Sequence, residues 1–310
     1  MKVKEYSYPS ASGLCEIKAW QWSPDDDKVK AVLQIHHGMA EHSGRYKNAI
    51  KAFTDMGYAV FMNDMINHGK SNKNKKDLGY FGKKDGYKSI IKDAKTLMDI
   101  AKKEYPDKPY IISGHSMGSL AMRCFINDYN DCFDGAVFIG TSGTNPLAQI
   151  SLVLTGAVSA VKGDKYKSQW LYNIAFKPYD KPFEHRTTYD WGTRDKASVD
   201  DYMADEYCGF LFTASGYQDL GKMVIECNND KWYQSVKKDT PVLLISGSMD
   251  PVGNYEKGVK EVYDKLIKTG HTCVDIKLYP NARHEILNEL NKEEVYEYID
   301  NFITSNVLNK

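Results

Sequence analysis

The sequence predicts an α/β fold with a mostly parallel central sheet, helices on both faces and one inserted segment. Short apolar runs typical of buried strands alternate with helical patterns, which is the order of crossover units in a parallel sheet. This alternation lapses between about residues 143 and 238 and then resumes. A Gly-x-Ser-x-Gly pentapeptide joins one of the apolar runs directly to a helical pattern. Together these observations favour one α/β core with an insertion over the strand ends.

The overall composition excludes several classes of protein. The 310 residues contain 41 Lys and Arg and 41 Asp and Glu, so there is no broad basic field to hold nucleic acid. The six cysteines show no CxxC or zinc-site spacing, and we expect them to be reduced thiols. The N-terminus lacks the apolar region of a signal peptide, and no run reaches the ~20 apolar residues of a membrane span. We therefore expect a cytoplasmic protein.

The first part of the chain follows the strand–helix alternation closely. Loose alternation of polar and apolar residues over residues 3–22 predicts an edge hairpin of two strands. Over residues 87–101 the apolar side chains recur at helical spacing, which predicts an amphipathic helix. Further strands are expected over residues 28–36, 58–62, the run after Pro109 and 135–139, and further helices up to about Met56 and over 117–129.

The irregular middle of the chain is predicted to be an inserted cap. It is rich in aromatic residues, whereas a linker would be richer in Gly, Ser and Pro. Regular alternation resumes with strands over 242–246 and 273–279, one helix between them and a final helix carrying Val295 to Ile303. We therefore divide the chain into a core of residues 1–142 and 226–310 and a cap of residues 143–225.

The pentapeptide Gly114-His115-Ser116-Met117-Gly118 has the strand–turn–helix context of a nucleophile elbow. Side chains at the two glycines would clash in so tight a turn, and the turn presents the Ser116 hydroxyl at the C-terminal edge of the sheet. The helix begins under the serine, so its free N–H groups face any charge that develops there. The pentapeptide alone is also compatible with a glycine-rich turn that happens to hold a serine. A reactive serine therefore requires partners elsewhere in the chain.

A serine hydroxyl becomes a nucleophile when a base takes its proton and an acid orients that base. In open α/β sheets such groups lie just past the C-terminal ends of strands. His284 follows the last expected strand, and Asp250 follows the preceding one in a short glycine-containing turn. The other histidines weighed as bases lie at less suitable places, namely His36, His68, His185 and His271. Ser116, Asp250 and His284 thus each end a different expected strand.

Two backbone N–H groups are also needed where negative charge develops on the substrate. The amide of Met117, directly after the serine, is one candidate. The other should come from the loop after strand 28–36, where His37-Gly38-Met39 offers the amide of Met39. On its own, a His–Gly pair after a strand is an ordinary turn.

Several motifs carry a resemblance to a known family. They are His37-Gly38-Met39-Ala40-Glu41-His42-Ser43-Gly44-Arg45-Tyr46, Asp64 with Asn67-His68-Gly69-Lys70-Ser71, Gly114-His115-Ser116-Met117-Gly118, and Ser248-Met249-Asp250 with His284-Glu285. The chain resembles the monoacylglycerol lipase and lysophospholipase group, within the serine-aminopeptidase-like branch of the α/β-hydrolase superfamily. The likeness covers about residues 28–142 and 241–305.

The resemblance implies an α/β-hydrolase fold, in which the chain order Ser–Asp–His is the expected one. It implies Ser116 as nucleophile, Asp250 as acid and His284 as base. It also implies the amides of Met39 and Met117 as the oxyanion hole. Met39 itself is a departure, since the corresponding position of a glyceride lipase is small.

Substrate-binding residues follow from the resemblance and from the cap. In glyceride lipases of this group, the positions matching Glu41 and Arg45 help to bind glycerol; the alternative is a surface ion pair one helical turn apart. The apolar run Leu147–Val161 is either a helix buried between cap and core or a lid that touches lipid outside and lines an acyl tunnel inside. The candidate substrate-binding residues are Glu41, Arg45, His115, Leu154, Phe210 and Phe212.

We therefore expect a serine carboxylester hydrolase, a monoacylglycerol lipase or lysophospholipase, acting through an acyl-enzyme. No metal or organic cofactor is implied, and the expected partner is a small-molecule lipid ester, with membrane or lipid aggregates as a transient contact of the cap. Two alternatives stay open. A proline-type aminopeptidase would hold a free amine with acidic cap residues, here Asp200, Asp201, Asp205 and Glu206. A non-catalytic relative of the same fold would bind a ligand without turning it over.

Overall fold

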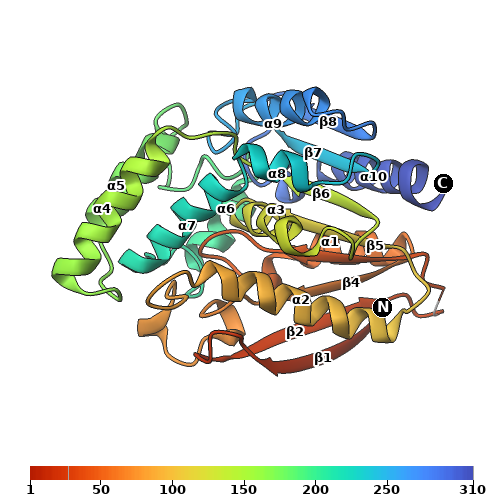
Figure 1. Cartoon of the computed structure of the whole chain (residues 1–310), viewed down its shortest axis with the longest axis horizontal. Helices are drawn as coiled ribbons and strands as arrows, with labels where there is room; N and C mark the ends of the chain where they lie inside the picture. Colours follow the sequence, from red (N-terminus) through yellow and green to blue (C-terminus); the bar gives the residue numbers. More distant parts are fainter. Residues whose placement is uncertain (27, 310) are drawn as a thin grey trace.

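Within residues 1–26 and 28–309, which the computed structural model describes, eight strands form one sheet (Figure 1). The strands are β1 (Lys2–Pro9), β2 (Glu16–Ser23), β3 (Ala31–His36), β4 (Tyr58–Asn63), β5 (Tyr110–His115), β6 (Gly135–Ile139), β7 (Val242–Gly247) and β8 (Val274–Tyr279). Their order across the sheet is β1-β2-β4-β3-β5-β6-β7-β8. Strand β2 is antiparallel to β1 and β4, and the other neighbouring pairs are parallel. The predicted strands and the mostly parallel sheet are confirmed.

The centre of the sheet is covered on both faces, as its sequence requires. Strands β3 to β7 carry apolar runs, and every residue in them is buried. Strand β1, at one edge, is mostly exposed. Strand β5 lies between β3 and β6, so the turn after β5 opens at the middle of the C-terminal edge of the sheet. The loops after the neighbouring strands therefore meet around this turn.

Helices pack on both faces, as predicted (Figure 1). The α-helices are α1 (Lys47–Asp55), α2 (Tyr87–Glu104), α3 (Met117–Tyr129), α4 (Leu147–Lys162), α5 (Gln169–Ala175), α6 (Lys196–Ala204), α7 (Ala214–Glu226), α8 (Asp230–Ser235), α9 (Lys257–Lys268) and α10 (Lys292–Ile303). Single turns of 3₁₀ helix lie at Ser43–Tyr46, Gly69–Ser71, Lys75–Asp77, Lys177–Asp180 and Ile286–Asn288, and a π turn at Thr304–Leu308. Apolar residues of α1 and α10 form one core, and those of α2, α3, α7, α8 and α9 form the other.

The predicted cap holds α4, α5, α6 and most of α7, and α4 and α5 lie well to one side of the sheet (Figure 1). Helix α4 packs along α7, which also contacts α2 and α3 of the core. A separate aromatic cluster, which includes Tyr189, Trp191 and Tyr202, packs against Met249 and Val252 in the loop after β7. The inserted segment is thus attached to the core on two sides.

Helix α4 turns one apolar stripe outward. Its side chains at Leu147, Ile150, Val153 and Val161 are 65%, 55%, 72% and 80% exposed. Leu154, in contrast, is partly buried against the core. A helix buried on every side between cap and core, one of the two predicted alternatives, is therefore wrong. None of the helices in the described part of the chain combines the length and hydropathy needed to cross a bilayer.

Candidate active site

Ser116 lies at a strained turn between β5 and α3. Its backbone has φ 52° and ψ −120°, a conformation that a non-glycine residue adopts only where the surrounding structure imposes it. A Cβ atom on Gly114 would lie 2.3 Å from the Gly118 carbonyl oxygen, and one on Gly118 would lie 2.2 Å from the His36 carbonyl oxygen. Glycine is therefore required at both positions for the turn to close. The serine itself is half-buried at the sheet edge.

Asp250 and His284 meet in the loops after β7 and β8. The His284 Nδ1 and Asp250 Oδ1 atoms are 2.9 Å apart. Asp250 is 0% exposed and His284 is 1% exposed. The carboxylate also accepts hydrogen bonds from the Ser246 hydroxyl (2.8 Å) and the Val252 N–H (2.8 Å). Burial alone would raise the pKa of Asp250, but His284 and these donors lower it overall. The carboxylate therefore stays ionised and holds the imidazole through Nδ1.

His284 lies over the ends of β5 and β6, next to the serine turn. Its ring centroid is 4.6 Å from that of His115, the residue before Ser116. A Cβ atom on Gly140, just after β6, would lie 3.1 Å from the His284 ring. The loops after three strands thus bring the predicted acid and base to the edge where the elbow opens.

The loop after β3 lies against the elbow. A Cβ atom on Gly38 would be 3.2 Å from the Ser116 Cβ and 3.1 Å from the His115 Nδ1. The amides of Met39 and Met117 donate to no other atom of residues 1–26 and 28–309. Two N–H groups are therefore available beside the serine, one from each predicted segment.

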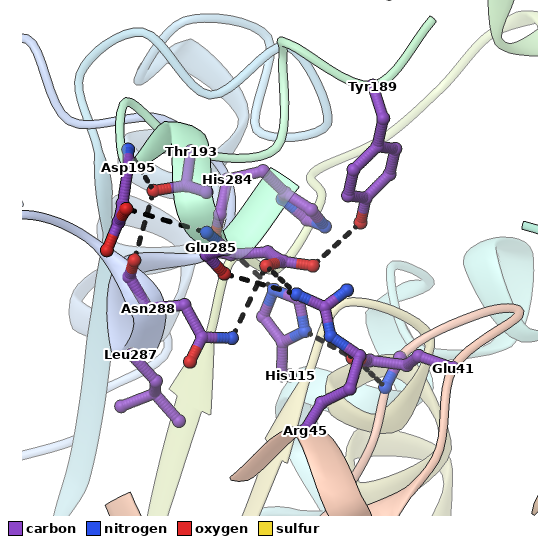
Figure 2. A network of polar contacts seen from close by, with 12 residues as sticks. Glu41, Arg45, His115, Tyr189, Thr193, Asp195, His284, Glu285, Leu287 and Asn288 are labelled. Atoms are coloured by element: carbon purple, nitrogen blue, oxygen red, sulfur yellow. Dashed lines mark hydrogen bonds and ion pairs between the residues drawn. The ribbon is translucent and has the colours of Figure 1, made fainter. Parts of the chain in front are cut away.

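Glu41 belongs to a buried polar network next to His115 (Figure 2). Its Oε1 atom accepts from the Gly38 N–H (2.5 Å) and the Tyr46 hydroxyl (2.8 Å) and lies 3.2 Å from the His115 Nδ1. The other ring nitrogen of His115 lies 3.3 Å from the His284 carbonyl oxygen. Burial opposes charge on His115, but the Glu41 carboxylate raises the pKa of His115 overall. A charge-assisted chain thus links the loop after β3 to the loop that carries His284.

Arg45 joins this network to the cap. Its guanidinium donates to Glu285 Oε2 at 2.6 Å, and the Tyr189 hydroxyl donates to Glu285 Oε1 at 2.8 Å (Figure 2). The ring of Tyr202 lies 4.6 Å from the guanidinium carbon. The Arg45 Nε and Glu41 Oε2 atoms are 3.8 Å apart, and the two side chains are only 8% and 3% exposed. The alternative prediction of a surface ion pair is therefore wrong.

Glu285, Tyr189 and Tyr202 were not predicted as neighbours of Arg45. Glu285 entered the sequence predictions only as part of the His284-Glu285 motif, without a role of its own. Trp191 was also missed, although its ring lies 5.3 Å from that of His284. All of these contacts join residues far apart in the sequence.

The predicted apolar residues of the substrate site occupy different depths. Leu154 and Phe210 are partly buried against the core, as is Met39. Phe212 is fully buried and packs edge-on against Phe81, with ring centroids 5.1 Å apart. Phe210 is therefore the more accessible of the two phenylalanines, and Phe212 supports it from behind, with ring centroids 6.0 Å apart.

A mostly parallel sheet in this strand order, with the serine turn after its central strand, is the α/β-hydrolase fold. Solved structures agree along almost the whole chain. A carboxyl esterase from Bacillus coagulans, solved with glycerol, has a TM-score of 0.92 and 30% identity over 99% of both chains. A lipase in an open form has a TM-score of 0.91 and 27% identity over 100% of both chains.

The sequence model of the family described as "Serine aminopeptidase, S33" matches residues 27–291, so the chain belongs to this family. A monoacylglycerol lipase from Mycolicibacterium smegmatis is 26% identical over 309 residues, which cover 98% of each chain. The resemblance predicted from the motifs, to the monoacylglycerol lipase group of α/β-hydrolases, is confirmed.

Proposed function

We propose that this protein is a serine hydrolase that cleaves the acyl esters of monoacylglycerols or lysophospholipids. That it is an ester-hydrolysing enzyme follows from its family and from its similarity to lipases and a carboxyl esterase. The observation that carries the catalytic assignment is the buried hydrogen bond between Asp250 and His284, beside a strained serine. Such a pair supplies an oriented base, which is what a serine hydroxyl needs to become a nucleophile.

In the proposed reaction His284 takes the Ser116 hydroxyl proton as the serine oxygen attacks the ester carbonyl carbon. The carbonyl oxygen becomes an oxyanion that accepts hydrogen bonds from the Met39 and Met117 amides. The intermediate collapses as His284 returns the proton to the leaving alcohol, which leaves an acyl ester on Ser116. Water then attacks this ester by the same steps, so the fatty acid leaves and the serine is regenerated. Asp250 stabilises the imidazolium in both halves.

We assign recognition of a hydroxylated head group to Glu41 and Arg45, next to His115. Within residues 1–26 and 28–309, Glu41 Oε2 and one terminal nitrogen of Arg45 are buried with no hydrogen-bond partner. A hydroxyl group suits both kinds of atom, because it can donate to the carboxylate and accept from the guanidinium. Tyr202 lies over the Arg45 guanidinium and Tyr189 donates to its partner Glu285, so in this proposal that part of the cap moves to admit the head group.

We assign the acyl chain to the apolar surface that Leu154 and Phe210 share with the core. The exposed stripe of α4, with Val153 at its centre, is then the face that contacts lipid aggregates. Residues 143–225 act as the cap in this proposal. Each methylene that enters an apolar tunnel contributes up to roughly 0.8 kcal/mol, or about a fourfold gain in kcat/KM until the tunnel is full.

Three of the four acidic cap residues that the aminopeptidase alternative would use have side-chain partners. Asp200 pairs with Arg186, Asp205 with His42, and Glu206 with Lys75. Asp200 and Glu206, which are paired with the cations of Arg186 and Lys75, attract a substrate amine less strongly than free carboxylates would. This pairing favours the ester substrate over the aminopeptidase alternative.

The test is a series of monoacylglycerols of increasing chain length. We expect kcat/KM to rise and then level off, and Leu154→Asp to flatten the rise. Val153→Asp is the matched control on the same helix, since its side chain is 72% exposed; it should lower turnover only for substrate in vesicles or micelles. If acetyl and butyryl esters react faster than decanoyl ones, the enzyme is a small-ester esterase and the tunnel assignment is wrong.

A further inference from the structure

His37 is a fully buried histidine whose two ring nitrogens have different partners. Its Nε2 atom lies 3.0 Å from the Met65 amide nitrogen, which is an N–H donor, so Nε2 must be the acceptor. The ring proton therefore resides on Nδ1, which lies 2.8 Å from the Gly38 carbonyl oxygen and donates to it. Burial also lowers the pKa of His37, which favours the neutral ring that this arrangement needs. One tautomer thus holds one specific carbonyl.

That carbonyl belongs to the Gly38–Met39 peptide, beside the serine. The residues around this peptide are held as well: the Gly38 N–H donates to Glu41, and the Ala40 carbonyl accepts from the Gly209 N–H of the cap at 3.0 Å. Ala40 has a φ of 52°, in the left-handed region, so the loop is also conformationally constrained. Within the described residues, the N–H of Met39 is left without an acceptor.

The direction of this free N–H depends on the carbonyl. The peptide is trans, so the Gly38 C=O and the Met39 N–H point in opposite directions. Glycine permits a wide range of backbone angles, so this peptide can turn over more easily than one after a residue with a side chain. If it turned, a carbonyl oxygen would face the serine side in place of a donor. The bond from His37 opposes this rotation.

We propose that His37 is a positioning residue that sets the orientation of the Gly38–Met39 peptide and so forms the oxyanion hole before substrate binds. The proposal rests on the proposed function in one respect, because it takes the Met39 N–H as an oxyanion donor. His37 does not touch the substrate. It acts through the peptide bond that follows it.

The test compares two variants that each keep one half of the imidazole. His37→Asn places an amide near Nδ1 and retains a donor for the Gly38 carbonyl. His37→Gln places an amide near Nε2, retains an acceptor for Met65 and leaves the carbonyl unheld. Loss of one oxyanion donor lowers kcat by about 10²- to 10³-fold. We expect His37→Gln to lower kcat by roughly 10²-fold with little change in KM, and His37→Asn to recover at least about tenfold of that loss.

A second readout separates this role from general damage to the fold. An alkyl boronic acid forms a tetrahedral adduct on the serine and uses the oxyanion hole, whereas a fatty alcohol of equal length does not. In His37→Gln we expect the affinity for the boronic acid to fall in parallel with kcat/KM. The affinity for the alcohol should stay as in the wild type. Equal losses of both ligands, or equal kcat values for the two variants, overturn the proposal.

The wild-type enzyme provides a measurement that needs no substitution. Nitrogen-15 NMR of labelled histidine should show His37 as the neutral tautomer with its proton on Nδ1 at pH 7. A proton on Nε2 contradicts the proposal, since Nε2 would then face the Met65 N–H. All kinetic arms use a soluble p-nitrophenyl ester. If the wild type does not cleave it, the proposed function fails; if the wild type does and His37→Gln retains its kcat, only this inference fails.

Discussion

Replacement of Asp250 by asparagine removes a charge while the structure keeps its shape. The asparagine oxygen can take the place of Oδ1 and accept from His284 and Val252. The new amide group then faces the Ser246 hydroxyl, which now lies 2.8 Å from Oδ2 and can rotate to accept. The His284 ring therefore keeps its tautomer and position, and the variant isolates the electrostatic contribution of the carboxylate.

The size of that contribution follows from the 2.9 Å separation of the His284 and Asp250 atoms. At an effective dielectric constant of ~20, two unit charges at this distance attract by about 6 kcal/mol. This attraction exists when His284 is an imidazolium, as in the transition state, and each ~1.4 kcal/mol is a factor of ten in rate. Because the neutral hydrogen bond is retained, we expect Asp250→Asn to lower kcat by about 10³- to 10⁴-fold.

The assay is steady-state hydrolysis of a soluble short-chain ester, with thermal unfolding as a check that the variant is folded. Asp264→Asn, at an exposed position on α9, is the matched control and should behave as the wild type. KM should change far less than kcat. An Asp250→Asn enzyme that keeps more than a tenth of the wild-type kcat would refute the role given to this carboxylate.

Three further predictions concern stability. Gly118→Ala should abolish folding or cost several kcal/mol, because its Cβ would lie 2.2 Å from a carbonyl oxygen; denaturant unfolding checks this, and unchanged stability contradicts the geometry of the elbow. Arg123→Met should lower the free energy of unfolding by about 2–5 kcal/mol, because Arg123 is fully buried and its partners, among them Thr141 and Asn228, become buried acceptors without a donor. A loss below about 1 kcal/mol contradicts this. Burial raises the pKa of Asp219 to about 7, against ~3.9 when exposed, so the folded state holds the extra proton and stability should fall as pH rises from about 4 to 7. Asp219→Asn should flatten that slope, which thermal melts across the pH range can test.

The sequence was informative wherever function depends on the ends of consecutive strands. The loops after parallel strands meet at one edge, so Asp250 and His284 could be expected near each other without knowledge of the full strand order. Glycine spacing around Ser116 likewise predicts a local turn. A Cβ atom on Gly114 would clash with the Gly118 carbonyl four residues away, and one on Gly118 with the His36 carbonyl at the end of the neighbouring strand. Short-range sterics and topology were sufficient for these features.

Contacts set by tertiary structure were not predictable from the sequence. Arg45 and Glu285 are 240 positions apart, and no pattern of spacing pairs them. The tautomer of His37 depends on an amide at Met65, in a loop that follows a different strand. Helix α4 has apolar side chains on nearly every face, so its sequence shows no clear amphipathic pattern. The sequence therefore does not show which side chains, such as Leu154, face inward. Each of these contacts is determined by which segments pack together in the folded protein.

The central claim is that Ser116 is the nucleophile, and covalent labelling tests it most directly. A fluorophosphonate probe reacts with an activated serine, and mass spectrometry of the digested protein locates the adduct. We predict one adduct, on the peptide that carries Ser116, and its loss in a folded Ser116→Ala variant that has also lost ester turnover by several orders of magnitude. Ser89→Ala on α2 is the control and should label fully. An adduct on another residue, or a Ser116→Ala enzyme with a tenth of wild-type activity, would contradict the account.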